Sequence, residues 1–500
     1  MGDVAKVVVG VALVATGLGA VGIGFMAGTS ASLALGGALA GLGSTALVYG
    51  AVGVMALAGI SMIGGALTPE IPDFGTTASY AGQKLQTRKN NTSPVPIAYG
   101  RNRLAGNIIW ESTGTQVSGA DNKDYWAVVA LCNHDIGSIN GVYANADALT
   151  DRGSNIYTST YIGTKTDYQA SSVSLQALSW STADSTATST GATLGFPDID
   201  LPAGITYVTL HQIFEATNSN QLKSISLDFM GKPTRSIVSG AFNSTVTDPT
   251  NVEIMADVLT TWLEVEDSAL DLDSFTTAKA DATANGLSDA NLALVTQANI
   301  QSVLQDIMAS GRLQLARSQG KWVVITDKSQ KTPSKTLTEA DIINGTISIN
   351  MPGNNDLANS ITMNWVNPAD EWLKADYTVT DTDLIGYDGR TVNKSLDIKS
   401  VIVESQAQKL AEITLNSMRY TEDIDGNRLK QTPLTCSFGA TTKHADIEVG
   451  DVVVVDHFLL DRARKFLILS VETDQSGIIS FSTREYCETH YKDTSGSYLI

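Results

Sequence analysis

The chain begins with an apolar segment that water alone cannot accommodate. No charged side chain occurs between Lys6 and Glu70, and Gly or Ala fills 28 of the 63 positions from Val7 to Pro69. Because apolar surface is driven out of water, such a segment has to be covered by lipid, by other proteins or by copies of itself. The sequence therefore predicts a protein that works as a part of something larger.

Three interpretations of this segment differ in what covers it. A cleaved secretory signal has an apolar core of about 7–15 residues, and this run is several times longer. At about 20 residues per span its length permits a membrane anchor, and the pairs Gly24/Gly28 and Gly37/Gly41 have the spacing of helices that approach closely in lipid. However, the flanks carry no excess of Lys or Arg, and glycine at this density disfavours long helices. We favour short helices packed between subunits or plugging an assembly channel, and later entry into a membrane stays open.

The charge balance argues against nucleic-acid binding. The chain has 500 residues, enough for about three domains, and a net charge of -19. Phosphate binding needs clustered Lys and Arg, whereas the nearest basic group, which we interpret as scattered surface charge, is Arg88, Lys89, Arg101 and Arg103. No specific nucleic-acid binding is expected. An acidic wall beside DNA would instead keep the polymer from adhering.

The cysteines predict neither a disulfide framework nor a metal site. Cys132, Cys436 and Cys487 are odd in number and irregularly spaced. Cys132 with His134, and Cys487 with His490, each supply half of a ligand set, but no second pair stands at zinc-ribbon spacing. We expect ordinary packed residues, with no metal and no cofactor.

No arrangement of residues in the sequence predicts catalysis. Cys132 and His134 are two positions apart on a strand-like run, which does not place a thiol against a base. Two carboxylate pairs have the spacing of ordinary acidic loops: Asp198/Asp200 and Asp267/Asp271. We therefore expect that the protein is not an enzyme and has no catalytic residue.

The composition divides the chain into four predicted regions. An apolar helical segment spans 1–70, and a β-rich region over 71–245 holds a Ser/Thr-rich loop at 151–193. An α+β module is expected over 246–350 and a β-barrel region over 351–500. Short runs of β-branched and aromatic residues, bounded by Gly, Asn and Asp, indicate the strands. The predicted fold class is mainly β with one α+β module, preceded by Gly/Ala-rich helices.

Helix signals are clearest in the α+β module. Asp248 or Thr250 is expected to cap a helix whose apolar face is formed by Ile254, Val258, Leu259 and Trp262. Three further elements are predicted: a helix at about Ala298–Ala309, a hairpin turning at Ser318, Gln319 and Gly320, and a helix at about Ser405–Asn416. Gly450 is expected at a tight turn before a strand, with Asp451 as its cap.

The start of the body carries a phrase, SPVPIAYGRNRLAGNIIWES, that resembles the opening of tail proteins of many siphophages and gene-transfer agents. The residues that match are Pro94, Pro96, Tyr99, Gly100, Arg101, Arg103, Gly106 and Trp110. Later motifs follow the order found in the central tail-tip (J-type) protein of lambda-like siphophages. They comprise NSITMNWVNPADEW, DTDLIGYDGRTVNKSLDI and HADIEVGDVVVV, with the matching residues Asn364, Trp365, Asn367, Pro368, Gly389, Arg390, Gly450 and Asp451.

The resemblance implies a structural virion protein at the distal end of a phage tail. In that family a ring of copies, usually a trimer, forms a hub that closes the tail tube through β-barrel domains. The implied partners are further copies of the chain, other tail-tip and distal tail proteins, and the tape-measure protein. The lambda-type protein continues into fibronectin-like domains and a receptor-binding fibre, so we expect a separate chain to supply that fibre here. The apolar N-terminal segment has no counterpart in the lambda protein.

Two alternative functions remain beside the hub. A membrane-inserting, pore-forming protein would also account for the apolar segment. A tail-associated cell-wall hydrolase is the other, because some tail-tip proteins carry such enzymes. For the hub itself, contact of residues 7–67 with a host membrane at DNA ejection is an expectation.

Overall fold

The structure, a computed structural model, describes residues 94–500 apart from these gaps: 115–123, 145–146, 152–155, 160–171, 179–184, 187–199, 202–204, 214–223, 296–297, 353–356, 424, 474–476 and 494–496. The predicted apolar helices of 1–70 and most of residues 151–193 lie outside the described residues. The prediction of a loop over 151–193 is wrong for the part that is described, because Ile156–Ser159 and Ser172–Leu178 form paired strands of a six-stranded sheet. Within the described part of the chain, no helix combines the length and apolarity needed to cross a membrane.

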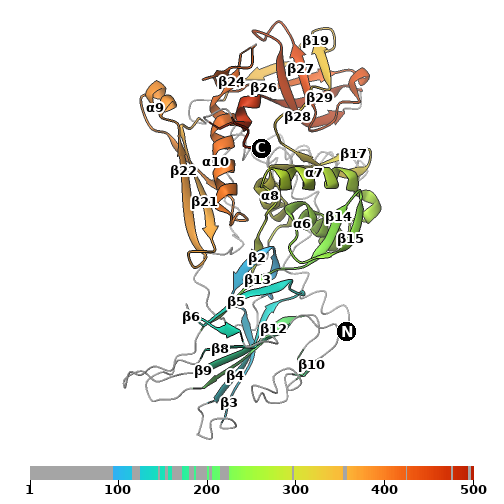
Figure 1. Cartoon of the computed structure of the whole chain (residues 1–500). Coiled ribbons are helices and arrows are strands. Elements are labelled where there is room, and N and C mark those ends of the chain that lie inside the picture. The colour runs from blue at the N-terminus through green and yellow to red at the C-terminus, as the bar shows by residue number, and fades with distance from the viewer. Residues whose placement is uncertain are drawn as a thin grey trace, which may run out of the picture.

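Two antiparallel sheets form the first part of the described chain (Figure 1). Their strand orders are β3-β4-β12-β9-β8-β7 and β2-β13-β5-β6. Leu104, Val129, Val208 and Phe229 are among the residues of the core that the two sheets share. The strands are β2 (Arg101–Leu104), β3 (Asn107–Gly114), β4 (Asp124–Cys132), β5 (Ser138–Ala144), β6 (Asp147–Ala148), β7 (Thr150–Asp151), β8 (Ile156–Ser159), β9 (Ser172–Leu178), β12 (Thr206–Ile213) and β13 (Ile225–Met230), with β10 (Ser185–Thr186) and β11 (Asp200–Leu201) as a separate pair.

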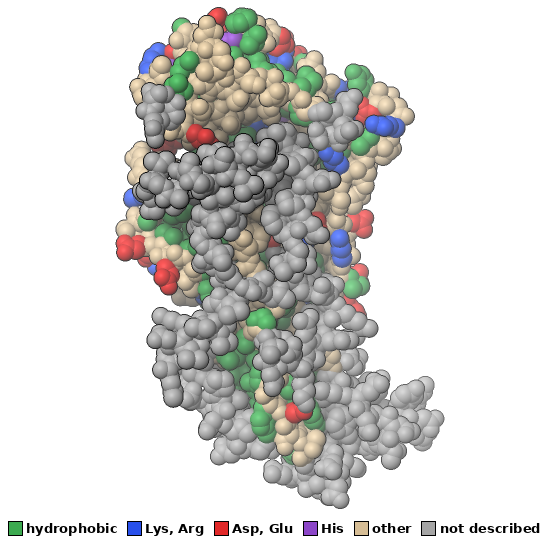
Figure 2. Space-filling model, turned by 180° about the vertical axis from the view of Figure 1, so that it is seen from behind, with side chains coloured by type: hydrophobic (Ala, Val, Ile, Leu, Met, Phe, Trp, Pro, Cys, Tyr) green, Lys and Arg blue, Asp and Glu red, His purple; other side chains and the backbone are tan. Residues whose placement is uncertain are grey.

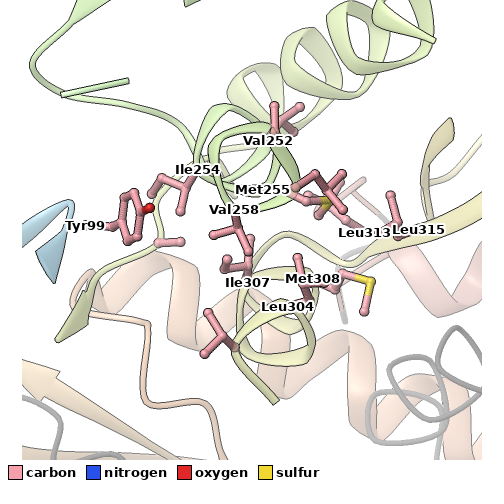
Figure 3. Close-up of a cluster of buried hydrophobic side chains, with 14 of the residues drawn as sticks. Tyr99, Val252, Ile254, Met255, Val258, Leu304, Ile307, Met308, Leu313 and Leu315 are labelled. Atoms are coloured by element: carbon pink, nitrogen blue, oxygen red, sulfur yellow. The ribbon is translucent and has the colours of Figure 1, made fainter. Parts of the chain in front are cut away.

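A helical module follows and is paired with the first described strand. Strand β1 (Ile97–Tyr99) pairs with β16 (Leu292–Leu294), which lies inside the module. Thr250 and Glu253 form a capping box at the start of α6, so the predicted helix start is confirmed. Figure 3 shows Ile254, Val258 and Ile307 converging between α6 and α8. The elements are β14 (Thr234–Val238), β15 (Ala241–Val246), α6 (Asn251–Asp257) with a π-helical turn (Val258–Trp262), a 3-10 turn (Asp267–Ala269), α7 (Leu272–Ala284), α8 (Ile300–Gly311), β17 (Leu313–Ser318) and β18 (Lys321–Thr326).

The next part is a small sheet covered by a long helix. Its strand order is β22-β21-β23, and α10 packs against one face through residues that include Leu410 and Ile413. In Figure 1, α10 runs alongside β21 and β22, and the short helix α9 stands at the end of β22. The elements are β21 (Ser360–Asn367), β22 (Leu373–Thr380), α9 (Thr382–Asp388), β23 (Asn393–Asp397) and α10 (Glu404–Arg419).

A second six-stranded sheet forms the last part of the fold. Its order is β19-β27-β28-β29-β26-β20, and side chains from all six strands meet in one core, for example Leu337, Phe438, Val453 and Phe481. The elements are β19 (Lys335–Thr338), β20 (Ser348–Asn350), β24 (Thr421–Glu422), β25 (Arg428–Leu429), β26 (Thr435–Ala440), a 3-10 turn (Thr442–His444), β27 (Val452–Asp456), β28 (Arg464–Thr473), β29 (Ile479–Glu485) and a second 3-10 turn (Glu488–Tyr491).

The predicted class, mainly β with an α+β module, is confirmed. The expected closed barrel is not found, because the last sheet ends at β19 and β20 and no pairing joins these strands within the described residues. β20 is only three residues long, too short to continue the ladder far. The boundary predicted at 350/351 stays a prediction, although β19 and β20 precede it and pair with strands that follow it.

Candidate functional site

His134 is buried, and both nitrogens of its ring are engaged with the backbone. Nε2 accepts a hydrogen bond from the N–H of Ala98 at 2.8 Å, and Nδ1 lies 2.6 Å from the carbonyl oxygen of Asp135. A neutral ring protonated at Nδ1 satisfies both contacts. Burial lowers the pKa of His134 to about 4, and burial raises the pKa of the Cys132 thiol well above its usual value. The pair therefore acts as packed structure and not as nucleophile and base.

The second half-site, at Cys487 and His490, is buried in the same way. Nε2 of His490 lies 2.7 Å from the carbonyl oxygen of Tyr420. Burial lowers the pKa of His490 to about 3, and it raises that of Cys487. Of the carboxylates singled out in the sequence, Asp267 forms an ion pair with Arg235 at 2.6 Å. Within the described residues, no three His, Cys, Asp or Glu side chains are placed to hold a metal ion.

The matched glycine Gly100 lies at a close approach where the first sheets meet the module. Its φ is +65°, and a Cβ atom there would lie 2.4 Å from the carbonyl oxygen of Ala290. The backbone on either side is bonded across the joint: Gly231 donates to the oxygen of Gly100, and Lys232 donates to that of Ala98, both at 2.7 Å. Only glycine fits this close approach without strain.

Tyr99 connects the first strand to the module through its hydroxyl group. The hydroxyl donates to Oδ2 of Asp257 at 2.6 Å and accepts from Nε1 of Trp262 at 2.8 Å. Nζ of Lys232 lies 2.5 Å from the same carboxylate oxygen and 5.8 Å from the ring centroids of Tyr99 and Trp262. Burial, followed by the charge of Asp257, raises the pKa of Tyr99 well above its usual value. Figure 3 shows the Tyr99 ring directed towards Ile254.

The two matched arginines of β2 have separate structural partners. Arg101 forms a two-point ion pair with the buried Asp228, through Nε at 3.0 Å and Nη2 at 2.8 Å, and its guanidinium lies 5.7 Å from the Trp372 ring. Arg103 donates to Oγ of Ser226 and stacks 3.9 Å from the Tyr143 ring. The view in Figure 2 shows Lys and Arg side chains interspersed with Asp and Glu on the described surface. The described part of the predicted basic group therefore does not gather into a phosphate site.

The Gly389-Arg390 motif closes the end of α9 and is held by α10. Gly389 has a φ of +69° and ends the helix in the left-handed conformation. The neighbouring Asp388 accepts two hydrogen bonds from Arg419, both at 2.8 Å, which hold the pKa of this carboxyl below its usual value. Asn359 donates to both Asp388 and the carbonyl oxygen of Arg390. The loop is therefore fixed against the helix and the start of β21.

A buried ionic cluster joins the hairpin of the module to the last sheet. Asp327, at the end of β18, is contacted by Arg312, by Arg484 of β29 at 3.1 Å and by the Tyr491 hydroxyl at 2.5 Å. Burial opposes the charge of Asp327, but the two guanidinium groups outweigh it and hold its pKa well below the usual range. No local spacing in the sequence links the members of this cluster, so the motifs did not predict it.

The matched Gly450 lies at the same joint and confirms the predicted turn. Its φ is +90°, and a Cβ atom there would lie 2.4 Å from Cγ2 of Ile325 on β18. Oδ2 of Asp451 accepts a hydrogen bond from the N–H of Glu448, which is the expected cap. Gly100 and Gly450 thus sit where parts of the fold meet, whereas Arg103 and the Gly389–Arg390 loop are held by contacts within one part.

Comparisons with known proteins agree with this picture. Residues 299–471 match the model of a family described as Phage-tail_3, putative phage tail protein. The fold is similar to that of a chain from the virion of a native gene transfer agent particle, with 15% identity, a TM-score of 0.56, and coverage of 93% of this chain and 98% of that chain. No curated protein matches the chain.

Two solved tail proteins are also similar over parts of the chain. One is a tail protein from Neisseria meningitidis MC58 (13% identity, TM-score 0.30, 72% of this chain and 96% of that chain). The other is a prophage tail protein from Listeria monocytogenes EGD-e (11% identity, TM-score 0.29, 67% and 90%). These two TM-scores are too low to establish a common fold. The family match over residues 299–471 supports a tail protein of phage-like type, and the gene-transfer-agent chain shares the fold of this one.

Proposed function

We propose that this chain is the central hub at the distal end of a phage-like tail. The observation that carries the proposal is the fold likeness to a virion chain, which spans 93% of this chain and 98% of the other. The order of the tail-tip motifs adds to it, and two of the matched residues, Gly100 and Gly450, lie where parts of the fold meet. A structural role also suits the contacts of Tyr99 and Arg101, because the Tyr99 hydroxyl bonds to Asp257 and the Arg101 guanidinium bonds to Asp228.

In this proposal several copies, three by analogy with the family, form a ring that closes the tail tube. The ring binds neighbouring tail-tip and distal tail proteins and opens for the tape-measure protein and DNA when a separate fibre engages the receptor. The net charge of -19 suits a lumen through which DNA has to slide without adhering. The predicted regions 1–70, 71–245, 246–350 and 351–500 are the proposed domains of each copy. The apolar residues 7–67 pack around the ring axis and are available to enter a host membrane at ejection.

Labelling of intact particles tests the proposed place. An antibody against a surface peptide of the described chain, imaged on purified particles by electron microscopy, should mark the tail end far from the capsid. Label along the tube or on the capsid would contradict the hub. A chain that fractionates with membranes in the absence of any particle would favour the pore-forming alternative, and lysis of peptidoglycan in a gel would favour the hydrolase.

Deletion of residues 7–67 tests the role of the apolar segment separately. The proposal predicts particles that fail to seal the tail tip or that adsorb without delivering DNA. A control deletes residues 163–168 of the Ser/Thr-rich region, which have no part in the proposed seal, and leaves six residues to connect the paired strands β8 and β9. Normal assembly and unchanged infection after removal of 7–67 would eliminate this role while leaving the position of the hub untouched.

A further inference from the structure

At two edges of the sheet of β21, β22 and β23, no further strand pairs among the described residues. Its order is β22-β21-β23, so the outer strands each pair on one side only. β22 offers eight residues, Leu373–Thr380, with no Gly, no Pro and no bulge in its register with β21. Natural proteins protect long regular edges, because their unpaired N–H and C=O groups recruit another strand. This edge is therefore suited to join a further strand.

The two faces of the sheet limit which strand can join it. On the side of α10 the side chains are apolar, with Met363 and Leu396 packed into the core. The opposite face carries small polar side chains that bond across the strands. Thr362 is 2.9 Å from the hydroxyl of Thr378, and Asn364 donates to Ser395 at 2.8 Å. An added strand has to alternate polar and apolar residues in the same phase.

We propose that the added strand is β23 of a second copy of this chain, so that copies join edge to edge in a continuous sheet. β23 has the required alternation, with Ser395 and Asp397 on the polar face and Leu396 on the other. β22 is antiparallel to β21, and β23 is parallel to β21, so β22 and β23 run in opposite directions. A rotation about an axis to which the strands are tilted preserves these directions and makes the junction an antiparallel pair, and the tilt allows a stagger between copies in a closed ring.

The pairing of two different edges gives the assembly its form. A contact between β22 of one copy and β23 of the next is heterologous, and such contacts generate a closed ring when the rotation closes. The proposal therefore rests on the ring of the proposed function and assigns one surface to it. In that ring α10 lies on one side of the continuous sheet and the Thr/Ser/Asn face lies on the other.

Charge selects the register of this junction. Asp376 and Asp397 both lie opposite Asn364 within one copy, so copies joined without stagger would set these two exposed carboxylates face to face. Like charges directly opposite are destabilising. A stagger of two residues keeps the faces in phase and brings Lys374 opposite Asp397 of the next copy. The same stagger places Ala375 opposite Leu396, which continues the apolar face beside α10.

Cysteine pairs in the full-length chain test the junction and its register. The variant with Lys374→Cys and Asp397→Cys places two thiols at directly opposite positions, within reach of a disulfide. Mild oxidation should give an inter-chain ladder on a non-reducing gel that ends at the number of copies in the ring. The native Cys132, Cys436 and Cys487 are buried and give little background. The pair Asp376→Cys with Asp397→Cys, which matches the unstaggered register, is the control and should cross-link weakly.

Each other outcome of this experiment overturns part of the proposal. If the variant with Asp376→Cys and Asp397→Cys cross-linked better than the variant with Lys374→Cys and Asp397→Cys, the two-residue stagger would be refuted. Cross-linking of Lys374→Cys alone would show two β22 edges meeting in a two-fold dimer. Oligomers that form without any cross-link would place the interface elsewhere. Because the readout needs no particle, it fails or succeeds independently of the position of the protein in the tail.

A charge swap gives a second measurement on the same pair. Lys374→Asp should weaken association by about fivefold per interface, and the double variant Lys374→Asp with Asp397→Lys should restore it. Sedimentation velocity of the purified chain reports both. Lys443→Asp, at a side chain that is 72% exposed and paired with Asp341 in its own copy, is the control and should leave association unchanged. Equal association of the wild type and Lys374→Asp would remove the pair from the interface.

Discussion

Removal of a single hydroxyl group tests whether the joint at Tyr99 holds the first sheets to the module. Tyr99→Phe keeps the ring against Ile254 and Val258, which lie in the same core. It deletes the hydrogen bond to Asp257 at 2.6 Å and the acceptor of the Trp262 N–H at 2.8 Å. The change is therefore confined to polar contacts at the joint.

The expected cost follows from what remains after the change. A hydrogen bond to a charged group contributes about 1.5–3 kcal/mol to stability. Asp257 keeps its contact with Lys232 at 2.5 Å, so its charge is not left without a partner. The N–H of Trp262 loses its acceptor but is only partly buried. We expect a loss of about 2 kcal/mol in the free energy of unfolding of the part that contains the joint.

Urea unfolding monitored by tryptophan fluorescence measures this loss. With a typical dependence on urea, about 2 kcal/mol moves the midpoint of the transition by about 1 M. The control is Tyr387→Phe, since that side chain is 75% exposed, and it should change stability by less than about 0.5 kcal/mol. A Tyr99→Phe chain as stable as the Tyr387→Phe chain would refute the assignment of Tyr99 as a joint.

Two further predictions concern the turn at Gly450 and the buried His134. Gly450→Ala adds a Cβ atom 2.4 Å from Ile325 at a φ of +90°. It should lower the free energy of unfolding by more than about 1 kcal/mol, which is seen as a lower melting temperature. The control Gly386→Ala, in α9 with nothing within 4 Å of the added Cβ, should raise the melting temperature slightly. Equal shifts of the melting temperature in the two variants would show that the close contact at Gly450 does not matter. Because the pKa of His134 falls from 6.5 to about 4 on folding, the unfolded chain binds the extra proton between these values, and stability is lost as pH falls through this window. Between pH 7 and pH 5, urea unfolding should show that this group lowers the free energy of unfolding by about 2 kcal/mol. The variant His134→Gln should lack this loss. If the variant and the wild type had the same pH dependence, His134 would not be the group responsible.

The sequence predicted those elements whose own residues determine them. Strands such as β4 and β27 are runs of β-branched and apolar residues, and α10 carries a regular apolar face with Leu410 and Ile413. Thr250 was identified as one of two possible caps of α6 because its side chain acts on the backbone of the same turn. Local physics is sufficient in these cases, since each signal lies within a few residues of its effect.

Two helices were missed because their local signal is weak. α7 buries only Phe275, Ala278 and Ala282, so its inner face is made largely of alanine and hardly differs from its outer face. α9 is seven residues long with Leu384 as its single buried residue, and its start depends on the Asp381 side chain. Such helices form because neighbouring elements cover them, which a residue pattern does not reveal.

The buried cluster around Asp327 lay beyond any local argument. Its partner Arg484 is 157 positions away and its partner Tyr491 is 164 positions away. Charged residues are normally assigned to the surface, because a buried charge is costly unless it is paired. Here the pairing is supplied by another part of the fold. The sequence therefore gives no sign that Asp327 is anything other than a loop carboxylate.

Demands on single residues also explain why short motifs carried the resemblance seen in the sequence. A strand in a sheet accepts many apolar residues of similar size. A close approach is more demanding: at Gly100 and Gly450, where parts of the fold meet, any side chain collides with a neighbouring part of the chain. At Arg101, a replacement leaves the buried Asp228 on the neighbouring strand β13 without its cation. Because the Arg101 side chain is 41% exposed, water takes part of its place, and the cost stays below the roughly 3–5 kcal/mol of a fully buried pair. These demands are attached to single residues, so short motifs can carry a resemblance that the strands around them do not.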